Sequence, residues 1–396
     1  MAIGESLLKW TGLIGASGDK PKQKDDLRRL RKDVAEQLRR LESQLAKIDD
    51  RLAEIEERQL DSLDPGRGLR ASRIPQLDDI EAFLRTNHTR LDAPVVLISQ
   101  AQRSGGTLLS ELLDSHPAIA SHPNELAFAN QTEESWPTLD PELGPEKNFD
   151  LLFQSRPKLI ELGYVKGDQG EDAYPFFLIP QAQFQLFQHL FETTSPATAR
   201  QVFDLYFTSL FNAWLNRQGS LEAKDWIVAF APRLANDEAS VERFFECYPD
   251  GLLIQILRDP TTWYPSARGH RRSKKLGLAS EELLDIWCAS SEAIKRNAQR
   301  HGDRVIVLKF EDLVARTEPV MRDLAERLGI SFEPTLLAPT FNGAPIRANS
   351  SFPVDASGVI AGPLARKSNL SREEEDAIER RCRALYEDAL GSVTLR

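Results

Sequence analysis

The residues best suited to chemistry lie in a short loop between an apolar run and an amphipathic segment. Residues 94–99 are apolar and β-branched, as in a buried strand, and residues 107–114 have the spacing of a helix. Backbone N–H groups converge where such a loop enters a helix, and the helix dipole favours an anion there. Gly105 and Gly106 allow a ligand close to the backbone, and Arg103 adds a permanent cation. These residues predict an anion site.

The loop differs from a nucleoside-triphosphate site. Such a site needs the pattern GxxxxGK[ST], in which a lysine reaches the outer phosphates and a hydroxyl holds magnesium. Here the lysine is missing, the cation Arg103 precedes the glycines, and Ser104 and Thr107 supply hydroxyl donors. We therefore predict a site for a single phosphate group and no metal.

A second candidate phosphate site follows another apolar run, residues 252–257, which is typical of a strand in a parallel sheet. The run ends at Arg258, and Ser266 lies on the helix that is predicted to follow. An arginine at a strand end and a hydroxyl on the next helix can hold one phosphate from two sides. The two motifs, in this order along one chain, are stronger evidence for phosphate binding than either motif alone.

The first motif, QRSGGTLL followed by LLDSHP, resembles the 5′-phosphosulfate loop of sulfotransferases that use 3′-phosphoadenosine-5′-phosphosulfate (PAPS). That family typically reads P-[KR]-S-G-T-T-x-L, whereas this chain has Gln102 for the proline and Gly106 for the first threonine. The second motif, RDPTTWYPS, resembles the family's R-D-P-x(5)-S, whose arginine and serine hold the 3′-phosphate of the nucleotide. The resemblance covers roughly residues 92–390.

The resemblance implies a fold, a co-substrate and a set of site residues. The fold is an α/β domain with a parallel β-sheet flanked by helices, as in P-loop proteins, and the co-substrate is PAPS without a metal. The implied nucleotide-binding residues are Arg103, Ser104, Gly105, Gly106, Thr107, Leu108, Arg258 and Ser266, with Arg366 and Lys367 of a C-terminal loop as further phosphate contacts.

Sulfuryl transfer also needs charge stabilisation on the transferring group and neutralisation of the leaving phosphate. The segment KDWIVAFAPRL is similar to a family strand that ends in a basic residue near the sulfate, which here is Arg233. Arg103, with the N–H groups of its loop, is expected to neutralise the leaving phosphate.

A base must accept the proton of the acceptor hydroxyl, and the family uses a Glu or a His. Glu125 is our first candidate, His122 the second, and His270 an accessory or alternative group. A carboxylate that caps the start of a helix is the alternative interpretation of Glu125. His116 belongs to the common HP turn, for which we expect a structural role.

Composition limits the class of protein. The 396-residue chain has a formal net charge of −10, which argues against a general nucleic-acid binder. Three cysteines without metal-ligand spacing predict a reducing compartment and no disulfide framework. No apolar run reaches the length of a membrane span, and the N-terminus is a poor match to a signal peptide. We expect a cytoplasmic protein without an integral membrane segment.

The chain divides into four predicted regions. Strands alternate with helices in the last region, which predicts a parallel sheet with helices on both faces. The strands lie near residues 94–99, 226–231, 252–257 and 304–308. The regions are an N-terminal segment at 1–24, with an interaction peptide as its candidate role; a coiled-coil helix at 25–60; a linker with a short helix at 61–91; and a sulfotransferase domain at 92–396, in which 118–223 is a mostly helical acceptor-pocket insertion.

Residues 25–60 are nearly all charged or aliphatic and contain no Gly or Pro. Apolar residues recur in steps of three and four, and from Leu38 onward they form a heptad seam. A helix of this length extends about 50 Å, at a rise of about 1.5 Å per residue. It either lies on the catalytic domain or pairs with another copy, and the strongly charged polar faces favour a homo-oligomer.

The acceptor is open at this stage. A small alcohol, a lipid and a hydroxyacyl chain on an acidic carrier protein are all compatible with a carboxylate base, and the cationic segment 268–275 would suit the carrier. Aromatic residues of the insertion, among them Trp136 and Phe149, belong either to the core or to an apolar acceptor cavity. The alternative functions are a catalytically inactive nucleotide-binding assembly subunit and, less favoured, a P-loop kinase.

Removal of residues 1–66 is expected to leave a folded, nucleotide-binding core and to change its assembly state. The heptad seam buries its leucines only when another helix covers them, and an exposed seam would be an aggregation liability. Sedimentation velocity of the full-length and truncated chains measures the change. Equal assembly states would mean that the helix packs on its own domain, and the coiled-coil interpretation would be wrong.

Overall fold

The chain forms two compact units, Met1–Ile74 and Pro75–Arg396, and every residue described below belongs to the second. The predicted coiled coil at 25–60 and the candidate phosphate contacts Arg366 and Lys367 lie outside the described residues. The computed structural model describes residues 77–126, 128, 135–153, 164–166, 172–174, 178–214, 223–346, 358–359, 364 and 370–395.

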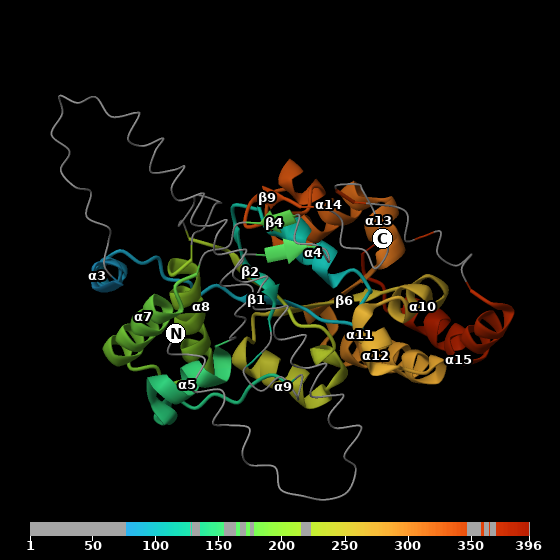
Figure 1. Ribbon diagram of the computed structural model, residues 1–396, viewed down its shortest axis with the longest axis horizontal. Coiled ribbons are helices and arrows are strands. Elements are labelled where there is room, and N and C mark those ends of the chain that lie inside the picture. The colour runs from blue at the N-terminus through green and yellow to red at the C-terminus, as the bar shows by residue number, and fades with distance from the viewer. Residues whose placement is uncertain are drawn as a thin grey trace, which may run out of the picture. The chain divides into compact units, whose positions relative to one another are not determined.

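A parallel sheet of five strands, in the order β2-β5-β1-β6-β7, forms the centre of the domain (Figure 1). All of its pairings are parallel, and Val96 of β1 lies between Val228 of β5 and Leu252 of β6. Helices cover both faces, so the inner strands are buried and read as continuous apolar runs. The predicted fold class is confirmed. The strands are β1 (Val95–Ile98), β2 (Ile119–Glu125), β5 (Trp226–Phe230), β6 (Leu252–Leu257) and β7 (Val305–Lys309).

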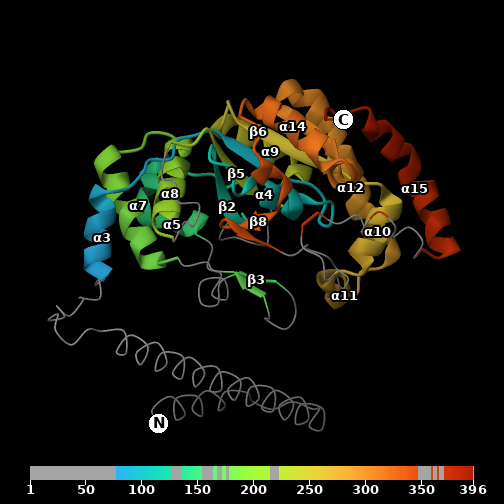
Figure 2. The same ribbon diagram turned by 90° about the horizontal axis from the view of Figure 1, so that it is seen from above.

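The helices connect these strands and form the layers on either side of the sheet (Figure 2). None of the described helices is both long and apolar enough to cross a membrane. The α-helices are α3 (Leu77–Thr86), α4 (Gly106–Leu113), α5 (Gly144–Leu152), α7 (Pro180–Thr194), α8 (Ala199–Asn212), α9 (Glu238–Cys247), α10 (Pro260–Arg268), α11 (Arg271–Leu276), α12 (Ser280–His301), α13 (Phe310–Ala315), α14 (Thr317–Leu328) and α15 (Arg372–Leu390). Two short antiparallel pairs complete the described elements, β3 (Tyr164–Lys166) with β4 (Asp172–Tyr174) and β8 (Thr340–Phe341) with β9 (Ala344–Pro345).

Alternate residues of β1 enter two separate apolar cores. Val96 and Ile98 pack in a core that includes residues of α4, α13 and α14. Val95 and Leu97 point to the opposite face and pack in a larger core with residues of α8, α9 and α12. Because β1 is held from both sides, the loop that leaves its carboxyl end starts from a fixed position.

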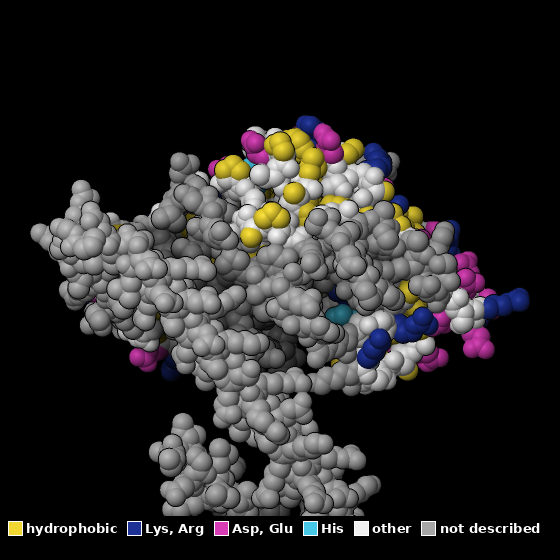
Figure 3. Space-filling view, turned by 45° about the horizontal axis from the view of Figure 1, so that its top comes forward, with side chains coloured by type: hydrophobic (Ala, Val, Ile, Leu, Met, Phe, Trp, Pro, Cys, Tyr) yellow, Lys and Arg dark blue, Asp and Glu magenta, His cyan; other side chains and the backbone are white. Residues whose placement is uncertain are grey.

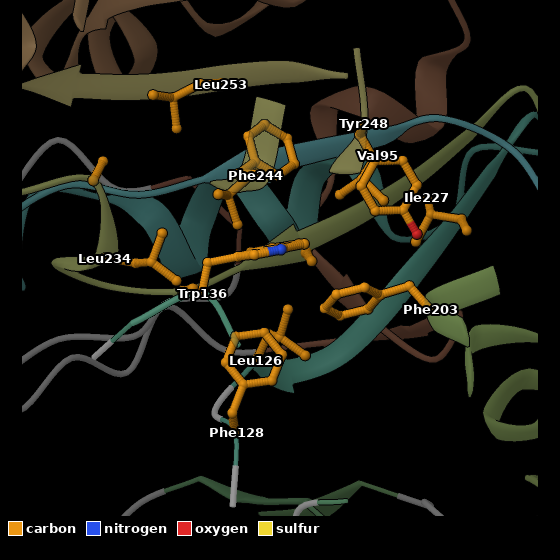
Figure 4. Packing of buried hydrophobic residues seen from close by; sticks show 14 of the residues in the cluster. Val95, Leu126, Phe128, Trp136, Phe203, Ile227, Leu234, Phe244, Tyr248 and Leu253 are labelled. Carbon is orange, nitrogen blue, oxygen red and sulfur yellow. The ribbon is translucent and has the colours of Figure 1, made fainter. Parts of the chain in front are cut away.

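Aromatic residues of the insertion belong to the larger core. The Trp136 side chain is 2% exposed, and its ring stacks on Phe203 at a centroid distance of 4.7 Å (Figure 4). Phe149 is also buried, and its ring lies 5.1 Å from that of Phe184. Of the two interpretations of these aromatics, the structure therefore supports the core for Trp136 and Phe149.

Strand β2 departs from the sequence prediction, which treated residues 118–223 as mostly helical. It is the edge strand of the sheet, and its register against β5 shifts between Ser121 and Glu125, around Pro123. A proline has no N–H for the ladder and is confined to edges and irregular positions, so this polar segment does not look like a strand. Glu125 consequently ends a strand, and its interpretation as a helix-capping carboxylate is wrong.

The C-terminal helix α15 packs against α10 and α12. Arg268, the first residue of the cationic segment 268–275, forms an ion pair with Glu374 of α15. Arg268 thus anchors a helix and is not simply a solvated charge.

The Sγ atoms of Cys288 and Cys382 lie 3.8 Å apart between α12 and α15, and both thiols are free. Lys and Arg side chains gather beside a histidine on the face shown in Figure 3.

Candidate functional site

The candidate residues of the two motifs follow the carboxyl ends of neighbouring strands. The anion loop with Arg103 leaves β1, and Arg258 directly follows β6. Glu125 is the last residue of β2, and Arg233 comes shortly after β5. Because these strands are parallel, their carboxyl ends lie together on one side of the sheet. Ligands bind at this carboxyl-end side in open α/β folds.

The loop after β1 is shaped to expose the start of α4. Gly105 precedes the helix with φ 102° and ψ 8°, a left-handed conformation that favours glycine. A Cβ atom at Gly105 would lie 2.6 Å from Cδ2 of Phe310, so the position also lacks space for a side chain. No side chain caps the helix from this position, which leaves its first N–H groups suited to an anion.

Two of the candidate cations also have left-handed backbones. Arg103 has a φ of 69° and Arg233 a φ of 65°, which cost free energy for a residue with a Cβ atom. Strain of this kind persists where surrounding contacts impose it, and it clusters at functional sites. The Arg233 N–H donates to the carbonyl of Gln100 at 3.0 Å, and the Arg103 carbonyl accepts from Arg258.

Arg258 joins the two motifs. Arg258 is 3% exposed, and its guanidinium donates from Nη1 to the main-chain carbonyl of Arg103. It also donates from Nε to Oγ1 of Thr262 at 3.1 Å and from Nη2 to the Thr262 carbonyl at 2.8 Å. The ring of Phe310 lies beneath it, 4.1 Å from ring centroid to Cζ. The arginine predicted for the 3′-phosphate therefore also fixes the loop predicted for the 5′-phosphate.

Ser266 lies on α10 and is fully buried. Arg258 holds this helix through Thr262, and the indole N–H of Trp263 donates to the carbonyl of Gln102 at 2.8 Å. The structure therefore places Ser266 on a helix that is bonded to the anion loop.

Glu311 is a residue of this site that the sequence prediction missed. Its Oε1 accepts from the Asp259 N–H at 3.1 Å and from the Thr262 hydroxyl at 3.0 Å. Burial raises the pKa of the Glu311 carboxyl, although these donors and the charge of Arg258 act in the opposite direction. Its position directly after β7, at the same carboxyl-end side of the sheet, is the signal that would have found it.

A pocket beside α4 contains both leading candidates for the base. Glu125 and His122 line it together with Thr107 of the anion loop, and Glu111 and Asp114 add two more carboxyl groups. Its empty space, counted with the open mouth, is about 360 Å³. Most of its lining residues are polar, and Phe230 and Phe341 add apolar surface. Among the described residues, no three His, Cys, Asp or Glu side chains are grouped as metal ligands.

The other two histidines of the prediction have different positions. His270 precedes α11 and does not line this pocket. His116 binds the Ser331 carbonyl through Nε2 at 2.9 Å, and its Nδ1 accepts from the Ala118 N–H at 3.2 Å. With Nδ1 as the acceptor, Nε2 is the donor to the Ser331 carbonyl. The structural role of His116 is confirmed.

Asp114 holds one wall of the pocket and was not predicted. Its Oδ2 accepts from the Thr340 hydroxyl and from the Gly343 N–H, both at 2.9 Å. Burial raises the pKa of the Asp114 carboxyl, and these hydrogen bonds partly oppose the shift. The bonds attach the β8–β9 hairpin to the end of α4.

Gly105→Ala is expected to destabilise the domain by about 1–2 kcal/mol more than Gly144→Ala. Both glycines have positive φ, so each alanine is strained, but only at Gly105 does a Cβ atom meet another residue. Urea denaturation of the two variants measures the difference. Equal losses would show that Phe310 moves aside and does not constrain the loop.

The chain is similar to solved structures of sulfotransferases and of a retinol dehydratase. The sulfotransferase domain from the curacin biosynthetic pathway is 19% identical, with a TM-score of 0.43 and coverage of 78% of this chain and 100% of that one. The sulfotransferase domain of the Synechococcus PCC 7002 olefin synthase is 18% identical, with a TM-score of 0.46 and coverage of 77% and 96%. Retinol dehydratase in a complex with retinol and PAP is 13% identical, with a TM-score of 0.34 and coverage of 81% and 87%.

No curated protein matches the chain. The Sulfotransferase family matches residues 94–334, a span that contains both phosphate motifs and strands β1, β2, β5, β6 and β7. The chain therefore belongs to the sulfotransferase family.

Proposed function

We propose that this sulfotransferase uses PAPS and transfers its sulfuryl group to a hydroxyl of an acceptor. The observation that carries the proposal is the hydrogen bond from Arg258 to the carbonyl of Arg103. This bond brings together one motif suited to a 5′-phosphate and another suited to a 3′-phosphate. A nucleotide with phosphates at both positions is the ligand class that would use the two motifs at once.

On the donor side, the chain provides positive charge and N–H groups for the leaving phosphate. Arg103 and the first N–H groups of α4 neutralise the 5′-phosphate as the bond from its bridging oxygen to sulfur breaks. The hydroxyls of Ser104 and Thr107 are further donors. Arg258 and Ser266 bind the 3′-phosphate, while contacts from the C-terminal loop stay a prediction.

On the acceptor side, the chain provides a base and a cation. The acceptor oxygen forms the new bond to sulfur in line with the leaving group, and Glu125 takes its proton. Glu125 shares a pocket with Thr107 of the anion loop, which supports this role, and Arg233 stabilises charge on the transferring group. His122 lines the same pocket and is the alternative base.

The lining of the pocket combines hydroxyl and carboxyl groups with the rings of Phe230 and Phe341, so a small alcohol could bind there through both kinds of contact. A lipid and a hydroxyacyl chain on an acidic carrier protein stay alternative acceptors. For such docking, Arg268 is already engaged by Glu374. The homo-oligomer and the inactive assembly subunit also stay predictions.

Titration calorimetry without added metal tests the nucleotide. The wild-type chain is expected to bind adenosine 3′,5′-bisphosphate (PAP) more tightly than adenosine 5′-monophosphate. Arg258→Ala and the milder Ser266→Ala should reduce that preference, because the loss of a buried charged hydrogen bond costs about 2–5 kcal/mol. Arg322→Ala is the control, since this arginine is half exposed on α14 and pairs with Glu318.

A wild-type chain that binds ATP with magnesium and does not bind PAP would contradict the proposal and favour a kinase. Equal losses of both nucleotides in Ser266→Ala would place the 3′-phosphate elsewhere, because this variant keeps the hydrogen bond from Arg258 to the Arg103 carbonyl. Circular dichroism of each variant shows whether a loss of binding reflects unfolding.

Glu125→Gln is expected to keep PAP affinity and to lower turnover by about 10²–10⁴-fold, the usual contribution of a positioned general base. Release of PAP from PAPS in the presence of a panel of small polar alcohols measures turnover. Glu142→Gln, an exposed glutamate outside the pocket, is the matched control. Near-normal turnover of Glu125→Gln would transfer the role to His122.

A further inference from the structure

Gln100 is a buried polar residue for which the site described above has no role. It lies in the loop after β1, and its side chain is 1% exposed. Neither Nε2 nor Oε1 has a hydrogen-bond partner in the part of the chain that the structure describes. Burial of a carboxamide without partners costs free energy, so native proteins rarely keep one unless a ligand supplies the partner.

The carboxamide of Gln100 lies against the first residue of α4. A Cβ atom on Gly106 would collide with Nε2 of Gln100 and with the ring of Phe230. The motif that this loop resembles has a threonine where Gly106 stands. Here the side chain of Gln100 fills the space that such a threonine would need. A glycine at residue 106 therefore removes a hydroxyl donor and at the same time leaves space for the amide donor of residue 100.

We propose that Gln100 is a further anion-binding residue of this chain, and that its amide group donates to an oxygen of the phosphate or sulfate bound at the start of α4. The chemical identity of that anion rests on the function proposed above. The main-chain carbonyl of Gln100 accepts from the Arg233 N–H at 3.0 Å, which holds the residue between the anion loop and the end of β5. Bound anion gives the carboxamide the partner that it lacks.

An anion-binding role for Gln100 and a space-filling role predict different effects of one substitution on thermal stability and on affinity for PAP. Gln100→Met keeps the volume and removes the donors. If Gln100 binds the anion, this variant unfolds at a higher temperature than the wild type without ligand, because a buried amide without partners is gone. The same variant binds PAP about 10- to 100-fold more weakly, the usual effect of losing one hydrogen bond to a charged group.

Gln100→Glu and Gln183→Met complete the design. The glutamate has the shape of the glutamine but places a carboxylate beside the anion, so its affinity for PAP should fall further than that of Gln100→Met. Gln183 is a fully buried glutamine on α7 that belongs to no motif of the site. Gln183→Met should therefore leave PAP affinity unchanged.

Calorimetry with PAP, and separately with inorganic pyrophosphate, gives the affinities, and thermal unfolding without ligand gives the stabilities. Wild-type affinity of Gln100→Met for both probes would overturn the inference, as would a joint loss of stability and affinity. A wild-type chain that binds pyrophosphate but shows no preference for PAP would contradict the proposed function, while the effect of Gln100→Met on pyrophosphate would still decide the role of Gln100. A wild-type chain that binds neither probe would overturn both.

Discussion

The hydrogen bond from the Arg258 guanidinium to the main-chain carbonyl of Arg103 is the contact on which the candidate site depends. It joins the end of β6 to the loop after β1, and these neighbouring strands are far apart in the sequence. Arg258 is only 3% exposed, so its guanidinium must find partners, since burial of an unpaired charge is costly. Thr262, Phe310 and the Arg103 carbonyl provide them. Folding thus places a buried cation beside the anion loop before any ligand binds.

Cationic and carboxyl side chains occupy different places along the carboxyl ends of the strands, an arrangement that suits transfer of an anionic group. Arg103 and Arg258 follow the central strands β1 and β6. The pocket at the β2 side carries carboxyl groups instead, among them Glu125 and Asp114. Under the proposed function, the first region would bind the anionic donor and a carboxylate of the second would accept the proton of the acceptor hydroxyl. Thr107 belongs to the anion loop and also lines the pocket, so the two regions adjoin.

The sequence predicts four of the five strands well, including the edge strand β7, and the other edge strand, β2, poorly. Strands β1, β5, β6 and β7 are buried on both faces and appear as apolar runs, whereas β2 contains Pro123 and polar residues, which an edge strand tolerates. Glu311 and Asp114 were missed because their partners, Asp259 and Thr340, come from distant parts of the chain. The coiled coil at 25–60 stays a prediction, because the described residues begin at 77.

Gln100 and Gly106 show that comparing a motif residue by residue can miss which side chain occupies a given space in the folded chain. Taken alone, Gly106 looks like the loss of a hydroxyl from the phosphate loop. In the folded chain, the absent side chain is what makes room for the carboxamide of Gln100. The two positions lie on either side of the turn that leads into α4, so a change at one alters the space at the other. A loop that appears weakened in sequence can therefore keep its number of donors.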